Sequence, residues 1–144
     1  METESDIRER RTACALLRIV VGVNLTMHGI SRIISGPGEF AAKLVIQFTH
    51  APLPAWSVWA FALILPSIEG ILGFLILIGL RTRAALIAAG VLIAVLTFGT
   101  ALVQDWNATG IQLTYAIVYA ALLFLGRYNG WSIDSWIARN SERT

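Results

Sequence analysis

The stretch PAWSVWAFALILPSIEGILGFLILIGL, residues 54–80, decides the fold class, because Glu69 is its only charged residue. A helix of about 20 mostly apolar residues is long enough to cross the hydrocarbon core of a bilayer. This stretch therefore predicts a transmembrane helix. A carboxylate inside such a helix costs roughly 2.5–3.5 kcal/mol on insertion scales. We therefore expect Glu69 to be paired, lined by water, or used in function.

The composition of the whole chain agrees with a membrane protein. Of its 144 residues, 56% are hydrophobic and 14% are charged, whereas about 25% are charged in soluble domains. This length predicts one all-α domain, residues 1–144, with the lipid bilayer as its main surroundings. The basic residues flank the apolar segments, so no nucleic-acid partner is expected. The acidic N-terminus METESD lacks the features of a cleaved signal peptide, and the lone Cys14 excludes an intrachain disulfide.

We predict a transmembrane four-helix bundle. Its spans run from about residue 13 to 34, 56 to 80, 84 to 103 and 111 to 126. Gly36-Pro37-Gly38 ends the first span, and Arg81-Thr82-Arg83 is a turn so short that the third span must return beside the second. Residues 104–107 together with Gly110 form the last predicted turn.

The arginines predict the orientation. If four spans alternate in direction, one side of the membrane receives Arg8, Arg10, Arg11, Arg81, Arg83, Arg127, Arg139 and Arg143. Only Lys43, and marginally Arg32, fall on the other side. The positive-inside rule then predicts a multi-pass protein of the cell inner membrane with both termini in the cytoplasm.

Two short helices are predicted outside the spans. In GEFAAKLVIQF, residues 38–48, Phe40, Ala41, Leu44, Val45 and Phe48 share one helical face, which suits an outer interfacial helix. Near the C-terminus, Ile133, Trp136 and Ile137 share a face of a short inner amphipathic helix, with Ser132 as its N-cap.

Several polar residues are predicted to meet inside the membrane. Asn24, His28 and Glu69 have similar depths, and the side chains of His28 and Glu69 lean toward each other because side chains tilt toward the N-terminus of their own helix. On the fourth span, Gln112, Tyr115 and Tyr119 share one face and bracket the depth of Glu69, and the third span offers the hydroxyls of Thr97 and Thr100. We predict a catalytic pair, Glu69 and His28, and a binding set of Arg18, Asn24, Arg32, Tyr115 and Tyr119.

Each of these residues also has an ordinary structural role to weigh. Arg18 is equally suited to extend to the lipid headgroups on the inner side. The two tyrosines are typical packing residues, and His28 is equally suited to form a hydrogen bond that joins two helices. The first span also carries a stripe of Arg18, Gly22, Leu25, Gly29 and Arg32, whose glycines allow a neighbouring backbone to approach closely. One well-placed histidine and one carboxylate are too few for a metal site, and no covalently bound cofactor is expected.

Two longer motifs carry a resemblance. LRIVVGVNLTMHGISRI, residues 17–33, and PSIEGILGFLILIGLRTRAALIAAG, residues 66–90, are similar to the two signatures of the DoxX family, and LLFLGRYNGWSIDSW resembles its C-terminal end. The resemblance implies a four-helix membrane subunit, in a family linked to thiosulfate:quinone oxidoreductase and other membrane redox complexes. Its polar positions correspond to Arg18, His28, Arg32, Glu69 and Arg83.

The favoured function is therefore a membrane subunit of a redox complex that binds quinone or another lipophilic small molecule around Glu69. The chain has no self-contained catalytic constellation, so a membrane or peripheral protein partner, or a second copy of the chain, is expected. The alternative is a non-enzymatic scaffold or assembly factor, in which Glu69 forms a structural pair with Arg18, His28 or Arg32. A transporter is less favoured, because no inverted repeat or pair of broken helices is present.

Overall fold

The computed structural model describes residues 2–141, which are helical and contain no strand. The elements are α1 (Glu4–Ile34), α2 (Pro37–Gln47), α3 (Ala55–Ile78), α4 (Thr82–Leu102), α5 (Trp106–Phe124), the 3-10 helix η1 (Leu125–Tyr128) and α6 (Ile133–Ser141). Four helices are long and apolar enough to cross a membrane. The predicted all-α membrane fold with four spans is confirmed.

The structure moves two of the predicted boundaries. α1 begins at Glu4, about three turns before the apolar segment, because Thr3 and Asp6 form a capping box. α5 begins at Trp106 and not near residue 111, because the Asp105 carboxylate accepts a hydrogen bond of 3.0 Å from the N–H of Ala108. The last turn is therefore shorter than predicted, and Gly110 lies inside the helix.

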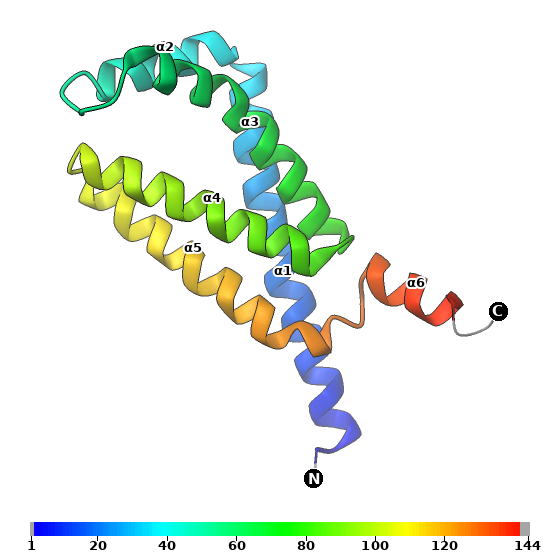
Figure 1. The fold of residues 1–144 in the computed structure, drawn as a ribbon. Coiled ribbons are helices and arrows are strands. Elements are labelled where there is room, and N and C mark those ends of the chain that lie inside the picture. The colour runs from blue at the N-terminus through cyan, green and yellow to red at the C-terminus, as the bar shows by residue number, and fades with distance from the viewer. Residues whose placement is uncertain (1, 142–144) are drawn as a thin grey trace.

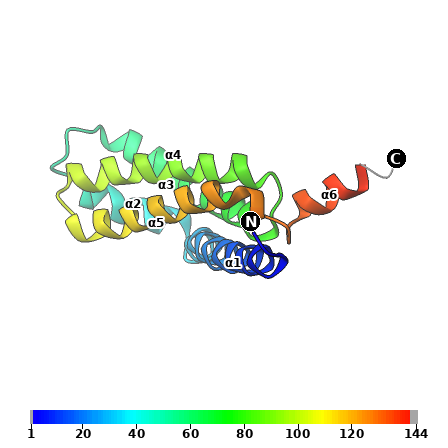
Figure 2. The same ribbon diagram turned by 90° about the horizontal axis from the view of Figure 1, so that it is seen from below.

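The helices form two pairs (Figure 1). α1 packs most extensively against the antiparallel α3, α4 packs against α5, and the two pairs cross at an angle, as Figure 2 also shows. Glycines bring α1 and α3 together: a Cβ atom at Gly22 would lie 2.6 Å from the Cα of Leu77, and one at Gly29 would overlap the backbone of Pro66 and Gly70. The predicted small-residue stripe of α1 is therefore its contact with α3.

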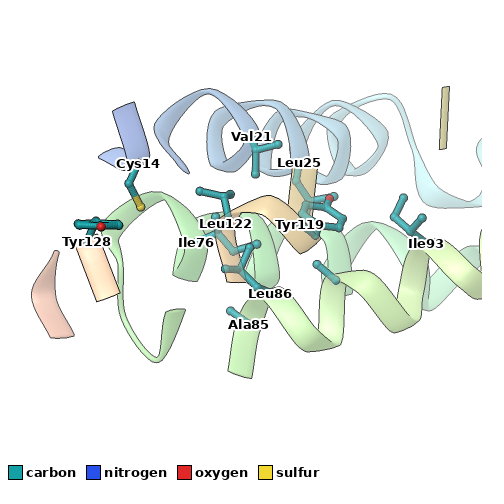
Figure 3. Packing of buried hydrophobic residues seen from close by; sticks show 11 residues of the cluster. Cys14, Val21, Leu25, Ile76, Ala85, Leu86, Ile93, Tyr119, Leu122 and Tyr128 are labelled. Atoms are coloured by element: carbon teal, nitrogen blue, oxygen red, sulfur yellow. The ribbon is translucent and has the colours of Figure 1, made fainter. Parts of the chain in front are cut away.

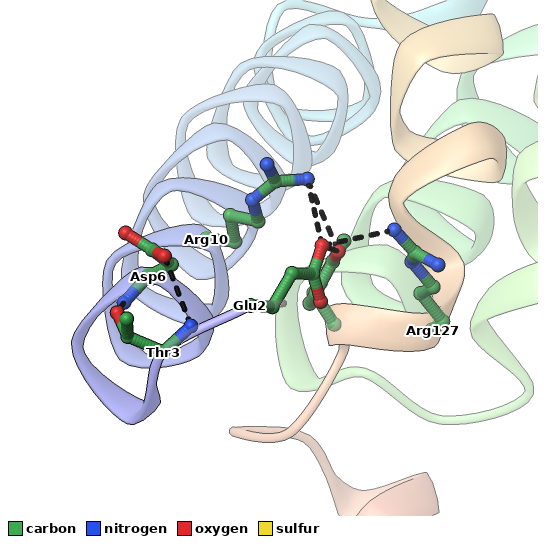
Figure 4. A network of polar contacts seen from close by, with 6 residues as sticks. Glu2, Thr3, Asp6, Arg10 and Arg127 are labelled. Atoms are coloured by element: carbon green, nitrogen blue, oxygen red, sulfur yellow. Dashed lines mark hydrogen bonds and ion pairs between the residues drawn. The ribbon is translucent and has the colours of Figure 1, made fainter.

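The two ends of the bundle differ. We call the end formed by residues 2–12, the α3–α4 turn, η1 and α6 the α6 end, and the opposite end, which carries α2, the α2 end (Figure 1). Side chains at the α6 end form a polar network: Glu2 pairs with Arg10 and Arg127 and accepts a hydrogen bond of 2.8 Å from the hydroxyl of Tyr128 (Figure 4). The arginine-rich segments meet at this end, as alternating spans require. That it faces the cytoplasm stays a prediction, and Arg143 lies outside the described residues.

The main hydrophobic cluster lies in the half of the bundle toward the α6 end (Figure 3), while Ala41, Val58, Ala62 and Leu65 are buried in α2 and the first half of α3. From α4 it takes Ala85, Leu86, Ala89 and Ile93, and from α5 it takes Tyr119 and Leu122. The later part of α4 and the first part of α5 contribute no residue to this cluster of buried side chains. The α4–α5 pair is therefore held to α1 and α3 mainly near its α6 end.

The two short predicted helices are present. In α2 the predicted apolar face is turned toward the protein: Ala41 is fully buried, and α2 packs on α3. This helix therefore packs against the bundle through the face that was predicted for the membrane interface. In α6, Ser132 Oγ accepts a hydrogen bond of 3.2 Å from the N–H of Ser135, as the predicted N-cap does. Its apolar residues Ile133, Trp136 and Ile137 are exposed, as an interfacial helix requires.

Candidate functional site

Glu69 lies near the middle of α3 and is 4% exposed. The guanidinium of Arg32 donates a hydrogen bond to its carboxylate, and no other side chain of residues 2–141 forms an ion pair with it. Arg32 comes from the last turn of α1 and also lies over the ring of Phe40 in α2, 4.6 Å from its centroid. The Glu69 carboxylate, which is energetically costly inside a membrane-spanning helix, is therefore paired with Arg32.

His28 does not join Glu69. Its side chain is exposed and forms no hydrogen bond or ion pair within the described part of the chain. The prediction that it meets Glu69 was wrong because it compared depth along the helices without rotation around them. The face of α1 that contacts α3 contains Gly22, Gly29 and Arg32, and His28 lies beside that face rather than on it.

Asn24 and Tyr115 form a second polar contact. The hydroxyl of Tyr115 donates a hydrogen bond of 2.9 Å to the Asn24 side-chain oxygen and so joins α5 to α1. Tyr119, one turn later on α5, is buried in the hydrophobic core, with its ring centroid 6.4 Å from that of Tyr115. The predicted five-residue cluster is therefore divided: Asn24 binds Tyr115, Glu69 binds Arg32, Tyr119 packs in the core and His28 stays outside.

Arg18 is 3% exposed and lies far from the Glu69 pair along α1. Its guanidinium donates to the carbonyl oxygens of Ile76 at 3.0 Å and Leu77 at 2.8 Å, and to that of Trp131 at 2.6 Å. A cation at these carbonyls stabilises the C-terminus of α3. Arg18 therefore does not join Glu69, and instead of reaching toward the headgroups it is buried among backbone carbonyls.

A cavity of about 470 Å³ lies in the α2 half of the bundle, outside the main hydrophobic cluster. We call it the α2-end cavity. Its walls come from α2, α3, α4 and α5 and are mostly apolar, and its lining residues include Phe40, Phe61, Leu65, Val95 and Phe98. Arg32 lines it too, so the Arg32–Glu69 pair borders the cavity.

A second polar group lies in this cavity, formed by residues that the sequence places near the depth of Glu69 but that the predicted cluster did not include. Thr100, another lining residue, donates to the Gln112 side-chain oxygen at 2.9 Å and shares a hydrogen bond of 2.9 Å with Thr109. Gln47 of α2 donates to Asp105 at 3.5 Å. The signal for Gln112 was present, since it occupies the same face of α5 as Tyr115 and Tyr119. The contact between Gln47 and Asp105 joins segments far apart in the sequence and left no local pattern.

Within residues 2–141, no three His, Cys, Asp or Glu side chains are grouped so that they could hold a metal ion. The α2-end cavity instead combines apolar walls with hydrogen-bond donors. The chemistry that this arrangement supports is the binding of a largely apolar molecule that carries acceptor oxygens.

Comparison with known proteins corrects the DoxX resemblance. Residues 10–114 match the family model described as methylamine utilisation protein MauE, whereas no curated protein and no solved structure matches the chain. The motifs that suggested DoxX are short and apolar, and several of their residues are explained by helix packing: the glycines join α1 to α3, and Arg18 binds the end of α3. The matched region covers well over half of the sequence and contains Arg18, Asn24, Arg32 and Glu69. The chain belongs to the MauE family of membrane proteins.

Proposed function

We propose that this protein is an integral membrane accessory protein of a redox pathway and that it binds a lipophilic small molecule of the quinone class in the α2-end cavity. The observation that carries the proposal is the position of Arg32. Its guanidinium is held by the nearly buried Glu69, yet Arg32 also lines a mostly apolar cavity of about 470 Å³. That volume falls within the range of about 300–1,000 Å³ typical of small-molecule sites.

The polar groups of the cavity suit a quinone ring. Arg32 has several N–H groups, and only its contact with Glu69 occupies them among the side-chain hydrogen bonds of the described residues. The Gln112 oxygen accepts from Thr100, which leaves its NH₂ group to face a ligand. A quinone offers carbonyl oxygens to such donors and an apolar ring to the phenylalanine side chains around them. In this proposal Glu69 is a positioning residue that orients Arg32, and His28 has no part.

The family name adds the redox context. It refers to methylamine utilisation, and the oxidative breakdown of an amine releases electrons that an acceptor must take up. A membrane quinone is one chemical class of such acceptors. The electrons would reach it from a partner protein, since we predict this chain to be a subunit and not a complete enzyme.

The scaffold function remains the second candidate. The Glu69–Arg32 contact favours it, because it is one of the structural pairs that the scaffold hypothesis predicts. However, Gly22, Gly29 and Gly73 already pack α1 against α3 and are not available to a partner's helix. The cavity favours the ligand-binding function over the scaffold.

The experiment fills the cavity without touching Arg32 or Glu69. Ala108 lines the cavity, and Ala120 is an exposed residue on the same helix that does not line it, so Ala108→Phe and Ala120→Phe are a matched pair. The thermal unfolding midpoint of the detergent-solubilised full chain is measured with decyl-ubiquinone and, for comparison, with dodecylbenzene, which lacks carbonyl oxygens.

We expect decyl-ubiquinone to raise the midpoint of the wild type and of Ala120→Phe but not that of Ala108→Phe, and dodecylbenzene to have little effect on any of them. An equal rise in both variants, or an equal effect of dodecylbenzene, would mean that the quinone acts through the detergent micelle, and the proposal would be rejected.

A further inference from the structure

A second cavity, of about 410 Å³, lies at the opposite end of the molecule and shares no lining residue with the first. We call it the α6-end cavity. It is bordered by α1, α4, α5, η1 and the first turn of α6, and its lining includes Arg18, Arg83, Arg127 and Asp134. Neither the proposed function nor the family assignment uses it.

The lining of this cavity is positively charged. Three arginines and one carboxylate line it. Arg127 is already paired with Glu2, and Asp134 is also engaged, because it accepts hydrogen bonds from the backbone N–H groups of Arg81 at 2.7 Å and Thr82 at 2.8 Å. Asp134 therefore stabilises the start of α4, while Arg83 is exposed and forms no ion pair within residues 2–141. The balance favours an anion.

One buried donor in the lining lacks a partner. The Nε–H of Arg18 makes no hydrogen bond in the structure, although the residue is only 3% exposed and its two terminal nitrogens both donate to carbonyls, one to Ile76 and Leu77 of α3 and the other to Trp131. An unpaired buried donor is costly, and such groups normally have a partner. That nitrogen has almost no accessible surface, so an acceptor oxygen bonds to it only after a small rearrangement of the lining, whereas the exposed Arg83 meets a ligand in the α6-end cavity directly.

We propose that the α6-end cavity binds the phosphate group of an anionic phospholipid. A phosphate carries both the negative charge and the acceptor oxygens that the arginines require. The lipid is favoured over free phosphate because Leu86, Leu122 and Leu123 form an apolar part of the wall. Trp131 and Trp136, which are exposed at the same end of the molecule, are typical of the depth at which lipid headgroups lie. Basic pockets between transmembrane helices are common sites for such headgroups.

The test compares two arginines of the same turn. Arg83 lines the cavity and Arg81 does not, although both are exposed and two residues apart, so Arg83→Gln and Arg81→Gln change the net charge equally. Arg18 is left intact because it holds the end of α3. The full chain in mild detergent is titrated with phosphatidylglycerol, phosphatidylcholine or inorganic phosphate, the last at constant ionic strength. Retained lipid is counted by native mass spectrometry, and the thermal unfolding midpoint is followed in parallel.

We expect the wild type and Arg81→Gln to retain phosphatidylglycerol in preference to phosphatidylcholine. Arg83→Gln should bind it about fivefold more weakly, the factor that one arginine near an anionic lipid typically contributes, and should keep its unfolding midpoint in phosphatidylcholine. The proposal is overturned if the two variants lose phosphatidylglycerol equally, if phosphatidylcholine is retained as well, or if inorganic phosphate alone stabilises the protein as much as the lipid does. Because decyl-ubiquinone binding is measured at the other cavity, either proposal can fail without the other.

Discussion

Replacing Arg32 by glutamine is expected to destabilise the protein more than replacing Glu69, although the two residues form one ion pair. The reason is their unequal burial: the Glu69 side chain is 5% exposed and that of Arg32 is 26% exposed. In Arg32→Gln the carboxylate stays in the interior without its partner. In Glu69→Gln the guanidinium keeps an acceptor oxygen and retains access to its surroundings at the edge of the cavity.

The magnitudes follow from the same asymmetry. Removing one partner of a buried pair costs about 3–5 kcal/mol when the remaining charge is left uncompensated, so we expect a loss in this range for Arg32→Gln. Glu69→Gln exchanges a charged hydrogen bond for a neutral one and should cost about 1–2 kcal/mol. The double variant should cost less than the sum of the two, by about 1–3 kcal/mol, because the side chains are in direct contact.

The measurement is denaturant-induced unfolding of the purified protein in mild detergent, followed by circular dichroism. Lys43→Gln is the control, because it removes one charge from the exposed Glu39–Lys43 pair and should change the stability little. A larger loss for Glu69→Gln than for Arg32→Gln would refute the argument from burial. Additive costs in the double variant would show that the two side chains are not energetically coupled.

Three further substitutions test other contacts of the fold. Gly29→Ala should push α1 away from α3 and lower the unfolding midpoint strongly. Its control is Gly110→Ala, which should leave the midpoint unchanged or raise it slightly, because an added Cβ there meets no neighbouring element within 4 Å. Similar midpoints for the two variants would contradict the close packing of α1 on α3. Tyr115→Phe should cost about 1 kcal/mol by removing the hydrogen bond to Asn24, and an unfolding titration that shows no loss would argue against that bond. Asp134→Asn should cost about 1 kcal/mol by weakening the cap at the start of α4, most visibly as faster hydrogen exchange in the first turn of α4, and unchanged exchange would count against the cap.

The sequence predicts the spans well because their lengths and apolar composition are set by the bilayer. Its errors lie at helix ends, where one side chain moves the boundary. Asp105 is an example: it precedes a helix by one residue and caps it, so α5 begins before the apolar segment does. This signal was local and could have been used. The capping of α3 by Arg18 could not have been predicted from a local pattern, because the arginine and the carbonyls that it binds are nearly 60 residues apart.

The candidate site shows a different limit. Depth along a helix was enough to place Glu69 near the middle of the bundle, but not to choose its partner. The choice depends on rotation, and the α1 stripe already contained the answer: Arg32 lies on the same face as Gly22 and Gly29, which contacts α3, whereas His28 lies on its shoulder. The cavity itself has no sequence signal, because it results from the angle between two helix pairs.

That angle links the stability of the protein to its proposed function. α1 and α3 are held together by glycine contacts between residues 22–29 of α1 and residues 66–77 of α3, with Arg18 binding α3 at its C-terminal end and Arg32 binding it near its middle. The α4–α5 pair is anchored through Ala85, Leu86 and Tyr119 in the core, while its α2 half lines the cavity. A ligand in the α2-end cavity would therefore lie between a tightly packed helix pair that carries the arginine and a second pair that is held mainly at its far end. A molecule that contacts both pairs would add packing between them at the α2 end, which is why binding should appear as a rise in the unfolding temperature.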